Sequence, residues 1–152
     1  MKKSQSSASL SIESSSKERL KDCIEFEERV RYSETDQLGV AHNKSYFEWF
    51  EIGRTEFCRQ KDISYKDIEK KGYYLVVVEA FCRYKRPLKY DEQFFIRVSL
   101  KELKPKKVIF EYELIAKKDR KLIASGYTVH VSTDSEARVR TLPSKILGKL
   151  AA

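Results

Sequence analysis

The chain has 152 residues, of which 41% are hydrophobic, enough to form the core of one domain and too few for two. Its 31 Lys and Arg outweigh 23 Asp and Glu to give a net charge of +8, which favours an anionic partner such as nucleic acid, an acidic membrane or a phosphate-bearing small molecule. Three widely spaced cysteines and two histidines argue against a disulfide framework and a zinc site, and predict a cytoplasmic protein without a metal.

The first 22 residues are rich in Ser, Lys and Glu and lack the apolar stretch of a secretion signal, so we expect a flexible N-terminal tail at 1–22. The remainder, 23–150, is predicted to be a single domain. No window approaches the roughly 18 apolar residues that are needed to cross a bilayer, so no membrane insertion is expected.

A strand and a long helix open the predicted domain. In residues 24–31, one face of a strand would carry Ile24, Phe26, Glu28 and Val30 and the other only charged side chains, which is typical of a strand with one buried face. The segment that follows from residue 45 to 60 predicts a helix, because its apolar residues recur at spacings of three and four and form one buried stripe. That stripe consists of Tyr46, Trp49, Phe50, Gly53 and Phe57.

A short helix and four strands complete the predicted order. Ser64 and Asp67 are placed to cap a helix over 64–71, and Gly72 is placed to end it. Four β-branched and aromatic segments follow, separated by turn-compatible stretches. They are YYLVVVEAFCRYKRP, QFFIRVSLKEL, KVIFEYELIAKKD and KLIASGYTVHVST. His130, in the last of them, is expected to be a partly exposed strand residue rather than a ligand.

This order predicts an α+β fold in which one mainly antiparallel sheet of about five strands wraps around a long central helix. The other face of such a sheet needs cover. Apolar residues predicted to face outward suggest that a second copy supplies it, so a homodimer or homotetramer is expected. These residues are Phe95, Ile109, Ile115 and Val129.

The junction between the first strand and the long helix reads RYSETDQLGVAHNKSYFEWFEIGR, from Arg31 to Arg54. It contains an aromatic-x-acid-x-Asp-x-x-Gly pattern followed by an aromatic residue on the helix. The residues that carry it are Tyr32, Glu34, Asp36, Gly39 and Tyr46, with Phe50, Glu51 and Arg54 further along the helix. This pattern resembles the signature of the hotdog-fold acyl-CoA thioesterases of the 4-hydroxybenzoyl-CoA thioesterase family. The resemblance covers about residues 26–132 and implies a hotdog fold that hydrolyses an acyl-CoA to a free acid and CoA, without a separate cofactor.

The resemblance also assigns roles at the junction. It makes Asp36 the catalytic carboxylate, as a nucleophile or as a general base, and it makes the backbone N–H of Asn43 the group that polarises the thioester carbonyl. Free amides at a helix N-terminus suit that second role because they carry partial positive charge. Gly39 is expected to adopt positive φ and to leave room for the substrate. From spacing alone, a turn or cap role is the favoured interpretation of Asp36, and it is the resemblance that favours catalysis.

Two positions depart from the family pattern. Many relatives carry a His where this chain has Asn43, and His42 precedes that position, turned about 100° away on a helix. We therefore expect His42 to be a structural or substrate-contact residue. Glu34 replaces an Asp, and it either raises the proton affinity of nearby Asp36 or is simply solvated. Tyr46 is expected to contact the substrate.

The phosphates of CoA call for cations near the pocket. By resemblance Lys85 and Arg86 are the candidates, although a solvated basic turn is an equally good interpretation. Two alternatives stay open: a hotdog enzyme acting on acyl carrier protein thioesters, and a noncatalytic module that binds acyl-CoA or RNA. Because the aromatic residues fall on a core stripe and no nucleic-acid motif is present, no nucleic-acid partner is expected.

Overall fold

A computed structural model describes residues 23–152, so the tail expected at 1–22 lies outside the described residues. The strands are β1 (Ile24–Arg29), β2 (Tyr74–Tyr84), β3 (Gln93–Lys104), β4 (Lys107–Ala116) and β5 (Leu122–Thr133). They form a five-stranded sheet in the order β1-β3-β4-β5-β2, and every neighbouring pair is antiparallel. The helical elements are η1 (Tyr32–Glu34), α2 (Asn43–Gln60), α3 (Tyr65–Lys70) and α4 (Ser144–Ala151).

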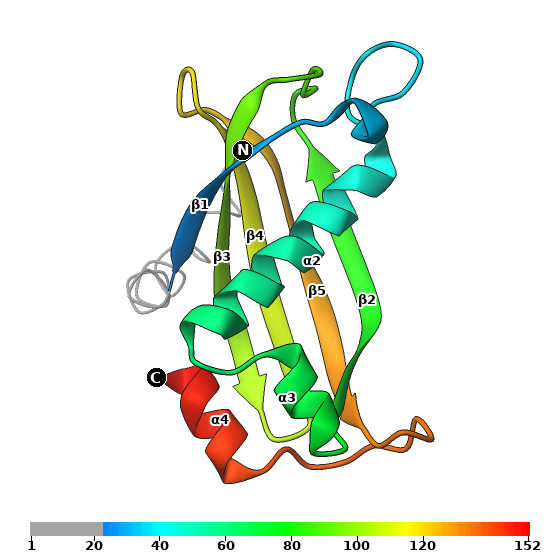
Figure 1. Cartoon of the computed structure of the whole chain (residues 1–152), viewed down its shortest axis with the longest axis vertical. Helices are drawn as coiled ribbons and strands as arrows, with labels where there is room; N and C mark the ends of the chain where they lie inside the picture. Colours follow the sequence, from blue (N-terminus) through cyan, green and yellow to red (C-terminus); the bar gives the residue numbers. More distant parts are fainter. Residues whose placement is uncertain (1–22) are drawn as a thin grey trace, which may run out of the picture.

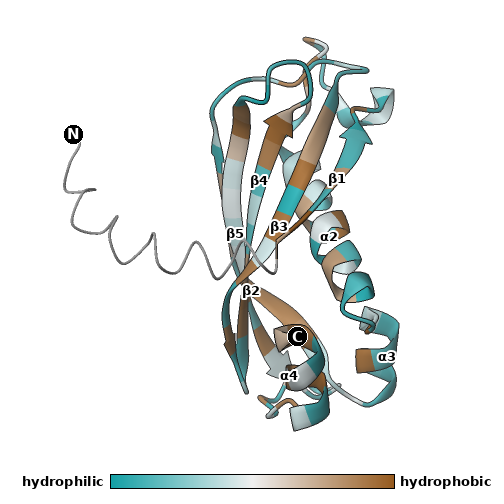
Figure 2. Cartoon of the chain, turned by 90° about the vertical axis from the view of Figure 1, so that its left-hand side faces the viewer, coloured by the Kyte–Doolittle hydropathy of each residue, from teal (hydrophilic) through white to brown (hydrophobic). Residues whose placement is uncertain are grey.

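The long helix α2 crosses one face of the sheet (Figure 1), and α3 lies on the same side (Figure 2). The predicted α+β hotdog fold is therefore confirmed, with its strand, helix, helix, four-strand order. The short helix was also predicted correctly, and Ser64 caps it by accepting a hydrogen bond from the Asp67 N–H. The sequence analysis missed α4, because two turns are too short for a clear apolar period; Ile146 and Leu150 on α4 are fully buried.

The core is the interface between α2 and the sheet. All five residues of the predicted helical stripe are buried. The Phe50 ring stacks on Tyr112 with centroids 4.2 Å apart, and the Trp49 ring packs on Phe94 at 4.7 Å. Gly53 allows the helix to approach closely, since a Cβ there would lie 2.6 Å from Val98 Cγ2. The stripe therefore fixes both the face of α2 that is buried and its distance from the sheet.

A chain of polar side chains runs through this interface. Arg54 donates from a guanidinium nitrogen to the Tyr112 hydroxyl at 3.5 Å, and that hydroxyl lies 2.6 Å from Thr128 Oγ1. Nε2 of His130 lies 2.8 Å from the same Thr128 oxygen. The expectation of a partly exposed His130 is wrong: its side chain is fully buried, and burial lowers its pKa to about 4. It is therefore a neutral core residue near pH 7.

The face of the sheet opposite α2 exposes less apolar surface than the sequence predicted. Within residues 23–152 no helix covers it, yet Ile115 and Val129 are only 6% and 9% exposed, and the Arg120 guanidinium lies 4.9 Å from the Phe95 ring centroid. Two of the four residues of the predicted apolar patch are thus buried within one chain, and the other two, Phe95 and Ile109, are half-buried. Among the exposed large apolar side chains, five lie instead along β2, at the edge of the sheet. They are Val76, Val77, Val78, Phe81 and Tyr84.

Two glycines should respond oppositely to alanine. A Cβ at Gly126 would lie 2.2 Å from the Phe81 carbonyl oxygen and 2.7 Å from the Phe50 ring, whereas a Cβ at Gly148 in α4 would meet nothing within 4 Å. We expect Gly126→Ala to destabilise the fold by about 1–3 kcal/mol through overpacking. Gly148→Ala should stabilise it by about 0.5–1 kcal/mol through helix propensity. Urea unfolding of both variants measures this, and equal midpoints would contradict the packing described here.

Candidate active site

The loop that leads into α2 is anchored by the side chain of Glu34, which is 8% exposed. Its Oε1 accepts a hydrogen bond from the Arg31 backbone N–H at 2.7 Å. Its Oε2 accepts one from the Arg31 guanidinium at 3.2 Å and one from Trp49 Nε1 at 3.1 Å. A buried carboxylate is stable only when its oxygens are satisfied in this way.

The backbone of Glu34 binds the start of the helix as well. Its carbonyl oxygen accepts hydrogen bonds from the His42 N–H at 2.8 Å and from Ser45 Oγ at 2.9 Å. Both expectations for Glu34 were therefore wrong: the carboxylate is neither solvated nor paired with Asp36, because it points inward to Trp49. It clamps the two ends of the junction together.

Asp36 lies in the exposed loop held by this clamp. Its Oδ1 accepts hydrogen bonds from the N–H groups of Leu38 at 2.8 Å and Val40 at 3.4 Å, and its own N–H donates to the Val40 carbonyl at 2.8 Å. Gly39 has φ +79°, as predicted, but a Cβ there would meet nothing within 4 Å. Within the chain, the constraint at this position is therefore the positive φ.

The same loop geometry recurs at Asp134. Its Oδ1 accepts from the N–H groups of Glu136 at 2.8 Å and Arg138 at 3.0 Å, and its N–H donates to the Arg138 carbonyl at 2.8 Å. Ala137 has φ 65°, in the place that Gly39 takes in the first loop. Asp36 therefore performs the turn role that spacing alone allowed, and any chemistry must come from its position beside α2.

The first turn of α2 leaves one amide without a partner. His42 is the N-cap residue: its Nδ1 accepts from the Lys44 N–H at 3.1 Å, and its carbonyl accepts from the Ser45 N–H at 2.9 Å. Among the described residues, the backbone N–H of Asn43 has no acceptor. The structural role expected for His42 is thus observed.

A hollow of about 320 Å³ is lined by Asn43, the residue that carries this amide. Four predicted site residues line it: Asn43, Tyr46, Lys85 and Arg86. Asp36, Gly39 and His42 are not part of its lining; the loop that holds them reaches the hollow at Ala41. The sequence analysis did not name three further lining residues, Ala41, Tyr84 and Pro87. Tyr84 could have been identified from the sequence, because it directly precedes Lys85 at the end of a predicted strand.

The side chains at this hollow have distinct electrostatic states. Burial raises the pKa of the Tyr46 hydroxyl to about 12, so it remains protonated near neutral pH, and its ring packs edge-on against Tyr84 at 4.8 Å. Two hydrogen bonds of 3.0 and 3.1 Å tie the Arg86 guanidinium to Asp119; they lower the pKa of the Asp119 carboxyl and raise that of Arg86. Lys85 is therefore the freer cation.

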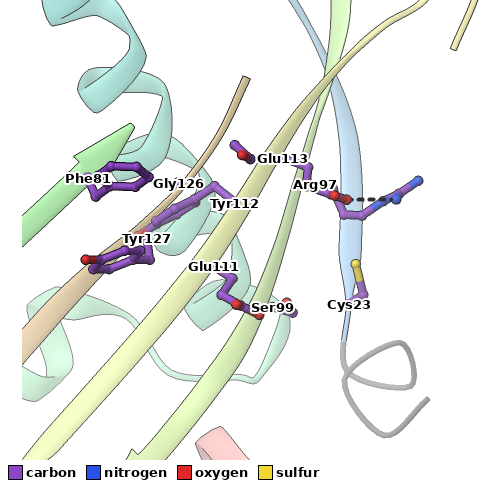
Figure 3. Close-up of a pocket in the computed structure, with 10 residues that line it drawn as sticks. Cys23, Phe81, Arg97, Ser99, Glu111, Tyr112, Glu113, Gly126 and Tyr127 are labelled. Carbon is purple, nitrogen blue, oxygen red and sulfur yellow. Dashed lines mark hydrogen bonds and ion pairs between the residues drawn. The ribbon is translucent and has the colours of Figure 1, made fainter. Parts of the chain in front are cut away.

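A second hollow, of about 380 Å³, lies on the sheet face opposite α2 (Figure 3) and contains none of the predicted site residues. The Phe81 and Tyr127 rings stack at one side of it, 5.4 Å apart. Its Arg97 bonds both Glu113 and Glu25, so its charges are already paired.

No helix in the described part of the chain is long and apolar enough to cross a bilayer. In the same part, three or more potential ligands of the His, Cys, Asp or Glu type do not gather at one point.

The Glu34 clamp should be required for stability. Replacing Glu34 by Gln puts an amide group among three hydrogen-bond donors and removes the charge that Arg31 faces, so we expect a loss of about 1–3 kcal/mol in the free energy of unfolding. Glu28→Gln is the matched control, because Glu28 contacts Arg31 at 3.4 Å without reaching Trp49. Denaturant unfolding compares the two, and an equal cost would show that Arg31, rather than the clamp to α2, matters.

The model of the thioesterase-like superfamily matches residues 30–150. A protein of Aquifex aeolicus (strain VF5), described as a candidate esterase, is 32% identical over 80% of this chain and 93% of its own. A Bacillus subtilis (strain 168) protein, YneP, described as a candidate acyl-CoA thioesterase, is 32% identical over 71% of this chain and 78% of its own. The solved structure of gentisyl-coenzyme A thioesterase BH1999 superposes with a TM-score of 0.75 at 28% identity and covers 84% of this chain and 99% of its own. The chain therefore belongs to the thioesterase-like superfamily, as a thioester hydrolase of hotdog fold.

Proposed function

We propose that this protein hydrolyses an acyl-CoA to the free acid and CoA, with the reacting carbonyl in the hollow in front of Asn43. The observation that carries the proposal is the unpaired Asn43 amide at the N-terminus of α2, which lines a hollow together with Tyr46 and Lys85. An N–H backed by the helix dipole stabilises the oxyanion that forms when a thioester is attacked. The names of YneP and BH1999, which refer to CoA thioesters, support the same substrate class.

In the proposed reaction, Asp36 acts in one of two ways. As a nucleophile, its carboxylate attacks the carbonyl carbon, expels the CoA thiolate and forms a mixed anhydride that water then hydrolyses. As a general base, it takes a proton from a water molecule that attacks the same carbon directly. Both routes consume one water and release the acid and the thiol of CoA. Neither requires a cofactor.

The hydrogen bonds of Asp36 leave it able to act. Only Oδ1 is used by the loop, and Oδ2 has no hydrogen bond with any residue that the structure describes. The Glu34 clamp keeps this loop against the first turn of α2. In the proposed site, Gly39 and His42 shape and cap that loop, while Tyr46 forms a wall of the hollow and Lys85 and Arg86 lie at its mouth.

The exposed apolar edge of β2 supports a homodimer. β2 is an edge strand of 11 residues, and an uncovered edge with valine and aromatic side chains favours pairing with another strand. We propose that two copies pair their β2 strands antiparallel about a two-fold axis. The three cysteines are free thiols, which supports the proposed cytoplasmic location.

A carrier-protein thioester is the second candidate substrate, because the net charge of +8 would suit an acidic carrier. A panel of acyl-CoA and acyl-carrier thioesters separates the two by their ratio of kcat/KM.

The role of Asp36 can be tested with a control from the same chain. We expect Asp36→Asn to lower kcat, measured as thiol release from acyl-CoA, by roughly a hundredfold or more. Asp134→Asn removes a carboxylate from a loop of the same geometry and should keep full activity. Equal thiol release by wild type and Asp36→Asn would show that another group attacks the carbonyl.

The β2 interface can be tested in the same matched way. Val78 is 58% exposed on β2, and Val139 is 61% exposed away from it. Val78→Lys should lower the mass measured by sedimentation equilibrium from dimer to monomer, because it puts a charge into the paired edge. Val139→Lys should remain a dimer. A wild-type protein that stays monomeric at tens of micromolar would contradict the proposed pairing.

A further inference from the structure

The ring of Tyr46 is held in one orientation at the start of α2. Tyr46 follows Asn43 by three residues on this helix and is 3% exposed. Its ring packs edge-on against Trp49 and Tyr84, with centroids 5.1 and 4.8 Å away. Trp49 is held in turn by its hydrogen bond to Glu34. Aromatic neighbours on two sides therefore fix the direction in which the Tyr46 hydroxyl points.

The hydroxyl of Tyr46 carries a proton that no hydrogen bond uses. Burial, with smaller contributions from Cys82 and Tyr84, raises its pKa to about 12, and a hydrogen bond with the Leu88 backbone opposes this rise. Only a bond donated to the phenol oxygen lowers a tyrosine pKa, so Leu88 contributes its N–H. Within residues 23–152, the Tyr46 O–H has no acceptor of its own. Because a buried donor without an acceptor is costly, we expect a bound ligand to supply one.

Two free donors therefore border the same hollow. Asn43 and Tyr46 both line it, and the Asn43 backbone N–H also has no acceptor in the described part of the chain. Long side chains on a helix lean toward its N-terminus and cover the turn that precedes their own Cα. The Tyr46 side chain accordingly covers the turn that begins at Asn43, so both donors face a ligand atom from the same side.

Resting on the proposed function, we propose that the Tyr46 hydroxyl is a second donor to the thioester carbonyl oxygen, beside the Asn43 N–H. When Asp36 or a water molecule attacks the carbonyl carbon, the π electrons of the C=O bond move to this oxygen, and both donors hydrogen-bond the oxyanion. The carbonyl then re-forms as the C–S bond breaks and the CoA thiolate leaves. Tyr46 donates a hydrogen bond and keeps its proton throughout.

Removal of one hydroxyl tests this role. Tyr46→Phe keeps the ring and should lower kcat for acyl-CoA hydrolysis about a hundredfold while KM changes less than about twofold, because the lost bond is strongest in the transition state. Tyr65→Phe is the matched control. The Tyr65 hydroxyl is buried as well, but Tyr65 does not line the hollow, so its removal should leave kcat at the wild-type value.

Calorimetry gives a readout that does not depend on turnover. A trifluoromethyl ketone analogue of an acyl-CoA forms a hydrate whose tetrahedral carbon resembles the reaction intermediate. Tyr46→Phe should bind this analogue about a hundredfold more weakly than the wild type does, and free CoA with unchanged affinity. Equal affinity of the two proteins for the analogue would overturn the inference.

A third variant covers the case in which Tyr46→Phe loses its fold, which urea unfolding detects. Incorporation of 3-fluorotyrosine at position 46 keeps the ring and makes the phenol a stronger donor, so kcat should rise roughly twofold. An unchanged kcat in this protein, or a raised KM with wild-type kcat in Tyr46→Phe, would overturn the inference while leaving the proposed hydrolysis in place. Failure of the wild type to hydrolyse any acyl-CoA would overturn both.

Discussion

The candidate site depends on one buried carboxylate. Glu34 accepts hydrogen bonds on its side chain from Arg31 and Trp49, and on its carbonyl from His42 and Ser45. A carboxylate removed from water at this cost holds its partners in a fixed geometry, since the loss of any of them leaves a buried charge unsatisfied. The loop before α2 and the first turn of α2 therefore move as one unit, which is a precondition for holding an attacking group near an oxyanion donor.

The loops of Asp36 and Asp134 share the same local geometry, so that geometry alone does not account for the chemistry proposed for Asp36. Asp36 and Asp134 accept the same pair of backbone hydrogen bonds and precede a residue with positive φ. One loop is clamped against the N-terminus of a long helix and the other follows the end of β5. The helix supplies an unpaired amide and partial positive charge. In acyl transfer these groups stabilise the oxyanion that forms when the carbonyl is attacked.

The edge strand β2 connects the hollow with the proposed dimer. Its end carries Tyr84 and leads directly into Lys85 and Arg86 of the hollow, and its beginning follows the corner where Arg140 stacks on Tyr73. An antiparallel two-fold pairing always places the beginning of one strand beside the end of the other. The proposed contact that would bury the apolar edge of β2 would thus lie beside the hollow, which Tyr84 lines.

The sequence alone was sufficient for the order of the elements, the buried stripe of α2, the short helix and the alternating strands, because these follow from local periodicity and turn chemistry. The tertiary structure decided what depended on neighbours distant in sequence. It showed Glu34 buried beneath Trp49, His130 enclosed in the core, and α4 held by its burial. It also placed more exposed apolar side chains at the β2 edge than on the sheet face, where Ile115 and Val129 are buried and Arg120 packs on Phe95. Periodicity identifies the face on which a side chain lies, but only packing determines what covers that face.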